Sequence, residues 1–532
     1  MSQEVVDQTV MAEKTKMDSD GKEVQYHEHV DIKPQGNAVN TFLVTTCTVF
    51  AAASFLFGFD DKVISPIVAL EPFVDKYQGP NPTTGKLVFT ARNQNLLFAV
   101  PLVGSILGAL AAYPLNNKFG RKWPLVGAYF ISIGGCFLQL FAPNLAAFIA
   151  GRFWNAFVMG IANSTAPLYL GETVPVSIRG RVVASINIMN LLAGVVATLV
   201  VFGTHTRLDK LSYMVPLAVQ CCLPVILIPL TAILPESPQW LIGQGRMDEA
   251  FAALRKLRGY SDAEVADELR MMKLCEENER NQSMEVSFWA IFDRKNLKRT
   301  ITAGSFFSFN QCSGVFLSTT YATVFLVDIG VASPFALTII ASCCTLAGTI
   351  VAPLLIDRLG RRPLALAGMA VLLAVDIAAG GLAFDMGDKQ KVLGIAALSF
   401  IFNFFWASSF YSLSNVMPTE IATIKLRSYT MSYTIAWAQT TAVITTIAVP
   451  QLTAADGANL GAKTYLIFAG CMVGIIAFVF FLMPETKNRT FAEIDEIYDA
   501  GVPMWRWAEY QTTTEAKQAK DLVVPEGKVL EE

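Results

Sequence analysis

The sequence has few charged residues for its length. Of its 532 residues, 16% are Asp, Glu, Lys or Arg and 53% are hydrophobic, whereas soluble domains carry about 25% charged residues. The mean hydropathy is +0.44. The charges are missing from long apolar runs, and a run of about 20 residues is long enough to cross a hydrocarbon core. We therefore predict a polytopic membrane protein.

Histidine is also rare, and cysteine is scattered. The three histidines, His27, His29 and His205, are not clustered, and no Cys-x-x-Cys pair occurs. We therefore expect no metal site and no disulfide framework. No basic patch with interleaved aromatic residues is present, which argues against a nucleic-acid partner. No catalytic triad, phosphate loop or nucleotide motif occurs either, so we expect neither a cofactor nor an enzyme activity.

Twelve apolar segments are long enough to be transmembrane helices. Residues 1–40 are too polar for a cleavable signal peptide, so we expect the first segment to be retained as an anchor. The predicted spans are 41–60, 94–115, 123–142, 145–169, 181–203 and 213–234, then 300–327, 334–356, 363–384, 392–414, 428–450 and 464–483. They define an N-terminal tail (1–40), a six-helix half (41–234), a loop with short helices (235–299), a second six-helix half (300–483) and a C-terminal tail (484–532).

Lys and Arg in the short loops indicate the orientation. The basic loops all fall on one side of the membrane if there are twelve spans, together with the central loop and both tails. By the positive-inside rule this side is the cytoplasm, so we expect both termini there. The basic residues are Lys118, Arg121 and Lys122, then Arg179 and Arg181, then Arg358, Arg361 and Arg362, and then Lys425 and Arg427.

A short basic motif occurs twice, between the second and third spans of each half. The copies are Asn117-Lys118-Phe119-Gly120-Arg121-Lys122 and Asp357-Arg358-Leu359-Gly360-Arg361-Arg362. Each has a polar residue, a cation, an apolar residue, glycine and two cations. A repeat at matching places predicts that the protein consists of two similar halves.

Four further motifs accompany the repeat at fixed places. They are Gly151-Arg152 in the fourth span, Tyr169-x-x-Glu172-x-x-Pro175-x-x-x-Arg179-Gly180-Arg181, Pro235-Glu236-Ser237-Pro238 after the sixth span, and Pro484-Glu485-Thr486-Lys487 after the twelfth. In this order they resemble the sugar-porter branch of the major facilitator superfamily, over roughly residues 50–500. The resemblance implies an all-α membrane fold of twelve transmembrane helices in two six-helix halves, which works by alternating access. The tails and loops look fungal.

Opposite charges gather at the predicted cytoplasmic helix ends. The resemblance implies that they form an ion-pair network that holds the halves together while the cavity faces outward. The alternative is that the cations only fix the topology. Asn117 replaces the usual Asp of the family, so we expect a weaker lock in the first half. The gate residues are Glu172, Arg179, Asp357, Arg358, Arg361, Arg362, Glu420 and Arg427.

The first span ends in Phe57-Gly58-Phe59-Asp60-Asp61-Lys62, and a charge inside an apolar span is a functional candidate. The resemblance implies that Asp60 accepts the proton in a symporter and faces Arg152. An Arg partner favours the carboxylate and burial favours the neutral acid, so a proton gradient can act on this group. The alternative is that Asp60 pairs only with Lys62, a residue unusual for the family. Facilitated diffusion is then possible.

Amide and aromatic side chains in the spans are candidates for sugar binding, because amides bind hydroxyl groups and aromatic faces cover C–H patches. Asn310-Gln311-x-x-Gly314 resembles the Gln-Gln-x-x-Gly of the family. The tenth span lacks the family's Gly-Pro-x-x-Trp, and Asn415 stands at the Trp position. Each aromatic residue could instead be ordinary packing. The substrate-binding candidates are Gln311, Asn310, Asn187, Tyr321, Asn415, Trp406, Trp437 and Gln439.

The sequence therefore predicts a multi-pass transporter of the plasma membrane that imports a mono- or oligosaccharide together with a proton, with facilitated diffusion as the alternative. Its partners would be a small-molecule sugar, the proton and membrane lipid. Two alternatives stay open: a transporter-like sugar sensor with little flux, and a carrier of a non-sugar polyol, acid or specialised metabolite.

Overall fold

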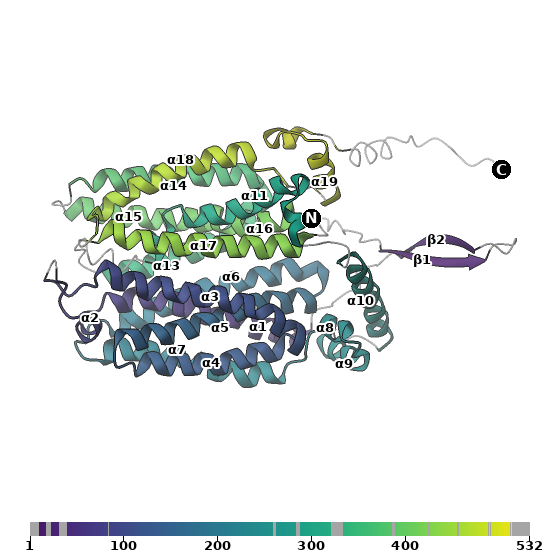
Figure 1. The fold of residues 1–532 in the computed structure, drawn as a ribbon, viewed down its shortest axis with the longest axis horizontal. Coiled ribbons are helices and arrows are strands. Elements are labelled where there is room, and N and C mark those ends of the chain that lie inside the picture. The colour runs from purple at the N-terminus through teal and green to yellow at the C-terminus, as the bar shows by residue number, and fades with distance from the viewer. Residues whose placement is uncertain are drawn as a thin grey trace.

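A computed structural model of the chain describes residues 10–17, 23–30, 40–82, 85–258, 262–283, 288–320, 334–385, 389–423, 426–454, 457–487, 489, 491–510 and 512. Long helices run side by side in two groups, one from each half of the sequence (Figure 1). We call the end at which α8, α9 and α10 lie the loop end, and the opposite end, where α2 lies, the far end (Figure 1).

The first group holds six long helices. Their starts follow local capping rules: the side chain of Asn144, for example, accepts a hydrogen bond from the backbone N–H of Ala147 at 2.9 Å, ahead of α5. The short helix α2 (Glu71–Tyr77) lies between the first two. The six are α1 (Thr41–Val68), α3 (Ala91–Phe119), α4 (Lys122–Leu140), α5 (Leu145–Thr173), α6 (Val176–Thr204) and α7 (Leu211–Ile233).

The second group repeats this arrangement with two interruptions. The seventh span is α11 (Arg294–Gln311) followed by the π-helical turn η2 (Phe316–Thr320). The tenth is α15 (Lys389–Phe405), which passes through the π-helical η3 (Trp406–Tyr411) into α16 (Ser412–Ile421). The others are α13 (Pro334–Leu359), α14 (Arg361–Leu382), α17 (Arg427–Thr453) and α18 (Thr464–Leu482), with the 3₁₀ turn η5 (Gly461–Lys463) before α18.

The remaining described elements lie at the loop end (Figure 1). The two strands form an antiparallel hairpin, which the all-α prediction did not anticipate. The C-terminal segment packs on the second half, where Asp495 pairs with Arg299 of α11. The elements are β1 (Val10–Met17), β2 (Glu23–Val30), α8 (Pro238–Gly243), α9 (Met247–Arg258), α10 (Asp262–Ser283), η1 (Phe288–Phe292), α19 (Phe491–Asp499) and η6 (Met504–Glu509).

The twelve-helix prediction is confirmed. Ten helical stretches among the described residues are long and apolar enough to cross a membrane. The other two predicted spans are α11, whose predicted continuation from residue 321 lies outside the described residues, and α17, in which Ser and Thr lower the hydropathy. These two helices pack against each other within the second half.

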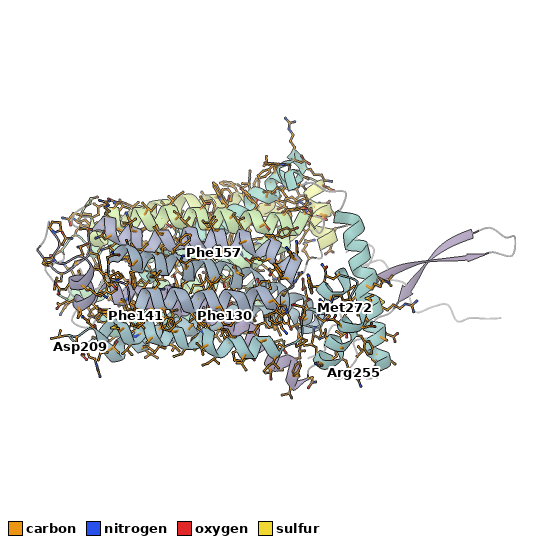
Figure 2. All side chains as sticks on the ribbon, turned by 60° about the horizontal axis from the view of Figure 1, so that its bottom comes forward. Phe130, Phe141, Phe157, Asp209, Arg255 and Met272 are labelled. Carbon is orange, nitrogen blue, oxygen red and sulfur yellow. The ribbon has the colours of Figure 1, made fainter. Side chains whose placement is uncertain are left out.

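The bundle surface matches a membrane protein. Phe130 and Phe141 are 60% and 67% exposed on the outside of the first half, while the charged Asp209 and Arg255 lie at opposite ends (Figure 2). Apolar side chains along the sides and charges at the ends are the pattern that a hydrocarbon layer with water on both faces requires.

The two halves meet along two helix pairs, α6 with α13 and α3 with α17. At the far end one apolar cluster draws on both halves. Ile64 and Tyr213 of the first half share it with Leu317, Tyr465 and Phe468 of the second. We call this the far-end seal. Because its members come from both halves, it closes the path between them at this end.

Inside the first half, glycines let α3 and α5 approach closely. A Cβ on Gly108 would lie 1.9 Å from the backbone oxygen of Phe157, and one on Gly160 would lie 2.1 Å from that of Ser105. Both contacts are with backbone, so a larger residue would force the helices apart. Small residues at such crossings are the usual means of close packing in membranes.

Substitution of Gly108 by alanine should therefore overpack the crossing and destabilise the protein by about 1–3 kcal/mol. The measurement is the thermal unfolding midpoint of the purified protein in detergent, which should fall. Gly134→Ala is the matched control, because a Cβ there meets nothing within 4 Å. Equal midpoints for the two variants would contradict the close α3–α5 crossing.

Candidate functional site

A buried ion pair lies in the centre of the first half. Asp60 of α1 is 3% exposed and Arg152 of α5 is 5% exposed, and a terminal guanidinium nitrogen of Arg152 lies 3.3 Å from Asp60 Oδ2. Gln220 of α7 donates from Nε2 to Asp60 Oδ1 at 2.5 Å. Three helices thus converge on one carboxylate. We call Asp60, Arg152 and Gln220 the buried carboxylate site.

Two polar atoms of this site have no hydrogen-bond partner among the described residues, Arg152 Nε and Gln220 Oε1. The hydrogen-bonding capacity of the site is thus only partly used, and each unpaired buried polar atom is costly. The sequence placed Asp60 opposite Arg152 but did not identify Gln220. The signal was present, because an amide inside an apolar span needs a polar partner.

Lys62 does not pair with Asp60. Its Nζ lies 2.9 Å from Asp61 Oδ2, and the two side chains are 21% and 37% exposed. The stem of Lys62 crosses Gly194 of α6, where a Cβ would lie 2.9 Å from Lys62 Cγ. The adjoining carboxylates Asp60 and Asp61 therefore have different cations, one buried and one partly exposed.

A cavity lies between the halves beside Lys62. It encloses about 440 Å³, a volume that includes open solvent. The first half contributes α1 and α6, and the second half contributes α13, α15 and the two π-helical turns. Among the polar and aromatic lining residues are Lys62, Ser318, Thr345, Asn403 and Trp406. π-Helical turns of this kind are frequent at functional sites.

The lining groups of the second half are held in place by hydrogen bonds. Trp406 Nε1 donates to Asn310 Oδ1 at 2.7 Å. Asn403 Nδ2 donates to the backbone oxygens of Ser318 and Ser399 at 3.2 and 2.8 Å, and Thr345 Oγ1 lies 3.2 Å from Asn403 Oδ1. The cavity wall is therefore preorganised, with an indole face and several hydroxyl groups.

The sequence candidates for substrate binding divide into three groups. Trp406 lines the cavity, and Asn310 supports it from behind. Tyr321 and the side chain of Asn415 lie outside the described residues. The rest are not among the described residues that line this cavity: Asn187, Gln311 and Gln439 are half-buried, and Trp437 is 48% exposed.

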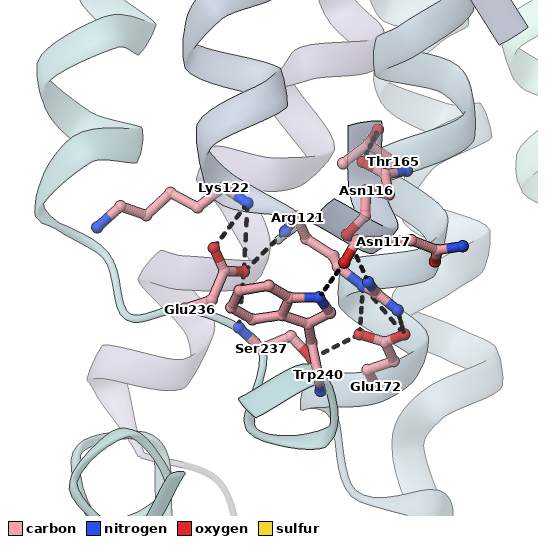
Figure 3. A network of polar contacts seen from close by, with 9 residues as sticks. All are labelled: Asn116, Asn117, Arg121, Lys122, Thr165, Glu172, Glu236, Ser237 and Trp240. Atoms are coloured by element: carbon pink, nitrogen blue, oxygen red, sulfur yellow. Dashed lines mark hydrogen bonds and ion pairs between the residues drawn. The ribbon is translucent and has the colours of Figure 1, made fainter. Parts of the chain in front are cut away.

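At the loop end the first basic motif is part of a polar network (Figure 3). Arg121 donates to Glu172 from Nε and a terminal nitrogen, with the shortest distance 2.6 Å. Ser237 Oγ donates to Glu172 Oε2 at 2.5 Å. Glu236 accepts the backbone N–H groups of Arg121 and Lys122 at 2.9 and 3.2 Å. The network joins α3, α4, α5 and the segment after α7.

The second half repeats this network. Arg361 lies 2.8 Å from Glu420, and Thr486 Oγ1 donates to Glu420 Oε2 at 2.5 Å. Glu485 accepts the backbone N–H groups of Arg361 and Arg362 at 3.1 and 3.0 Å. The doubled motif is thus a doubled structure, with Thr486 in the place of Ser237.

The motif glycine has the same role in both halves. Gly120 and Gly360 have φ of 89° and 92°, a region that strongly favours glycine. A Cβ there would lie 2.4 Å from Glu236 Oε2 and 2.9 Å from Glu485 Oε2. Each glycine therefore admits the carboxylate to the first backbone N–H groups of the next helix. Burial raises the pKa of the Glu236 carboxyl, and its N–H bonds act in the opposite direction.

The predicted gate residues are not all described. The side chains of Arg179, Asp357 and Arg427 lie outside the described residues. Glu172 pairs with Arg121, a residue of the repeated motif that was not among the predicted gate residues. Arg362 donates to the backbone oxygens of Phe480 and Trp505 at 2.9 and 3.3 Å, and the backbone oxygen of Arg358 accepts from Lys487 Nζ at 2.8 Å. All these contacts lie within one half, and the gating role stays a prediction.

Comparison with known proteins gives a consistent result. The family described as "Sugar (and other) transporter" matches residues 46–498. The major facilitator-type transporter ecdD of Aspergillus rugulosus is 31% identical, over 88% of this chain and 89% of its own. The probable glucose transporter rco-3 of Neurospora crassa is 27% identical, over 90% and 82%. The partially occluded inward-open structure of the E. coli xylose transporter XylE has a TM-score of 0.68 at 19% identity, covering 84% of this chain and 100% of XylE, and shows the same fold.

The loop-end pairs differ in burial, and their contributions to stability should follow that order. Glu172→Gln should cost about 3 kcal/mol, because it leaves a buried guanidinium without its carboxylate. Glu420→Gln should cost about 1–2 kcal/mol, since Arg361 and Glu420 are 15% and 21% exposed against 11% and 9% for Arg121 and Glu172. Thermal unfolding of the purified variants measures this.

The control is Glu249→Gln, which disrupts the pair with Arg246 on the surface, where the side chains are 49% and 58% exposed. It should cost less than about 1 kcal/mol. A Glu172→Gln variant as stable as this control would contradict the structural role of the Arg121–Glu172 pair.

Proposed function

Because the chain belongs to the sugar transporter family of the major facilitator superfamily, we propose that it imports a sugar together with a proton, by alternating access. The observation that carries the proposal is the buried carboxylate site, where Asp60 lies between Arg152 and Gln220. In this proposal the protein is in the plasma membrane, and the loop end, with its basic motifs and both tails, faces the cytoplasm.

The proton acts on the Asp60–Arg152 pair. When Asp60 is ionised, the pair ties α1 to α5 with little solvent around it. Protonation of the carboxylate removes the attraction and leaves Arg152 without its counter-ion. Breaking a buried pair costs about 3–5 kcal/mol, and each 1.4 kcal/mol changes the ratio of two conformations about tenfold. One proton therefore has enough energetic effect to shift the preferred conformation.

The arrangement of contacts at the two ends suits an inward-facing state. The far-end seal joins the halves, while the loop-end pairs Arg121–Glu172 and Arg361–Glu420 each lie inside one half. These internal pairs make each loop end rigid, so that the halves move as units. In the outward-facing state the gate residues of the two halves approach, and Arg179 and Arg427 pair with acids across the interface.

The sugar binds in the cavity beside Lys62. Trp406 offers an aromatic face to sugar C–H groups, and Ser318, Thr345 and Asn403 offer hydrogen bonds to hydroxyls. Residues of both halves line it, so closing either end changes the contacts with the sugar.

Asp60→Asn should abolish accumulation of sugar against its gradient and leave downhill exchange, because the amide cannot take up the proton. Uptake of radiolabelled D-glucose, D-xylose and maltose into a transporter-deficient host, with and without an uncoupler, measures this. Asp61→Asn is the matched control and should retain accumulation. Unchanged accumulation in Asp60→Asn contradicts proton coupling at this site, and no uptake of any of these sugars by the parent protein favours a sensor or another substrate.

Lys62 favours a second candidate, a carrier of an acidic sugar or another organic acid. A cation at the cavity wall can bind a carboxylate, and a hydrogen bond to a charged group contributes about 1.5–3 kcal/mol. If the substrate is an acid, Lys62→Met should lower the uptake of radiolabelled galacturonate at least about tenfold, and Lys62→Arg should retain most of it. Equal loss of glucose and galacturonate uptake in Lys62→Met would contradict this candidate.

A further inference from the structure

A second acidic residue lies inside the bundle, in the half that lacks the buried carboxylate site. Asp376 is in the middle of α14 and is 0% exposed. Neither of its carboxyl oxygens has a hydrogen-bond partner among the described residues. An ionised carboxylate in such a place would lack both water and a counter-ion, which costs several kcal/mol. Burial without a partner therefore favours the neutral acid over the carboxylate in this conformation.

The position of Asp376 links two apolar clusters. Val375, its neighbour in sequence, packs in the core of the second half. Ala379 and Ala383, one and two turns further along α14, belong to the far-end seal between the halves. Asp376 thus lies at the border where the core of one half meets the contact that closes the far end.

A helix that packs against Asp376's own helix is connected to the cavity. That helix is α18, which packs along α14 and carries Tyr465 of the far-end seal. The Tyr465 hydroxyl lies 3.2 Å from Ser318 Oγ and 3.1 Å from Ser399 Oγ. Ser318 lines the cavity, and the backbone oxygen of Ser399 accepts a hydrogen bond from the cavity residue Asn403. Polar contacts therefore run from the cavity to Tyr465 of the far-end seal, to which α14 also contributes.

No described cation on the neighbouring elements is placed to neutralise Asp376. The ammonium group of Lys463 in η5 lies over the ring of Phe384, and Lys391 of α15 pairs with Asp385. Arg361 pairs with Glu420 of α16 at the loop end. Arg358 of α13 is also at the loop end. The other described titratable groups on the elements that pack against α14 are Tyr465 and Cys471 of α18, Tyr411 of η3, and Cys343 and Cys344 of α13.

We propose that Asp376 is a second proton-binding site, which must be protonated for the far end to close. Opening of the far end separates the two halves of the seal, admits water to the side of α14 that holds Ala379 and Ala383, and lets Asp376 ionise. Reclosure requires the proton to return. Because Asp376 in this proposal both releases and regains its proton while the far end is open, it adds nothing to the proton carried with the sugar.

The sign of the effect follows from linkage. The closed far end binds one proton more than the open far end, so low pH favours closure and rising pH favours opening. The ratio of open to closed molecules should rise by up to about tenfold per pH unit in the range where Asp376 changes its protonation. This differs from proton coupling at Asp60, which would show in net uptake.

The test is a distance measurement across the far end as a function of pH. Spin labels replace Leu208 and Leu393, which are 85% and 57% exposed on the first and second halves, in a full-length chain without native cysteines. Pulsed electron spin resonance then reports the populations of short and long distances. All variants also carry Asp60→Asn, so that the buried carboxylate site contributes no titration.

In this background the distances should lengthen as the pH rises. Asp376→Asn, which mimics the neutral acid, should stay at the short distance at every pH, and Asp376→Glu should restore the pH response. A background protein with no pH response would overturn the proposal, as would an Asp376→Asn variant that responds like its parent. If the far-end distances do not depend on pH, the proposal of sugar uptake with a proton still stands. If the protein shows no sugar uptake with a proton, the far-end distance measurement still tests Asp376.

Discussion

The need to neutralise charge inside a hydrocarbon layer accounts for most of this structure. A buried charge is stable only with a counter-ion and hydrogen bonds. Asp60 meets Arg152 and Gln220 at the centre of the first half, and Glu172 and Glu420 meet Arg121 and Arg361 at the loop end. Each pair ties helices that are distant in sequence. The pairs thus help to fix the helix packing, and the Asp60–Arg152 pair is the one on which we propose that the proton acts.

The repeat adds a second constraint. In both halves a glycine with positive φ lets a glutamate accept hydrogen bonds from the first backbone N–H groups of the next helix. Beside it, an arginine pairs with a second glutamate, which lies on another helix. Glu236 and Glu485 lie in the segments after the sixth and twelfth spans. Each therefore joins the last span of its half to the start of the third span at the loop end. Halves that are internally bonded at this end and joined by an apolar seal at the other suit the proposed alternating access, in which each half moves as a unit.

Much of this could be predicted from the sequence, because length, hydropathy and motif order are local properties. The twelve spans and the two halves followed from them, and the resemblance to the sugar porters implied the Asp60–Arg152 contact. The role of Glu236 did not, although its motif was recognised, because a carboxylate that accepts backbone N–H groups 115 residues away leaves no periodic signal. The cavity was harder still. Trp406 was identified, but Ser318 of the π-helical turn η2 and Thr345 of α13 were not, because a π-helical turn departs from the regular helical period and Thr345 carries no motif. The pairing of Lys62 with Asp61 instead of Asp60 depended on geometry alone.

The central claim is that one proton, held at the buried carboxylate site, enters with each sugar molecule. The most direct measurement uses the purified wild-type protein in liposomes that enclose a pH-sensitive dye, with no pH or voltage gradient imposed. D-Glucose, D-xylose and maltose are added outside in turn, and sugar entry is followed in parallel. The account predicts that the transported sugar acidifies the lumen in proportion to its entry. Sugar entry with no change of internal pH would contradict it.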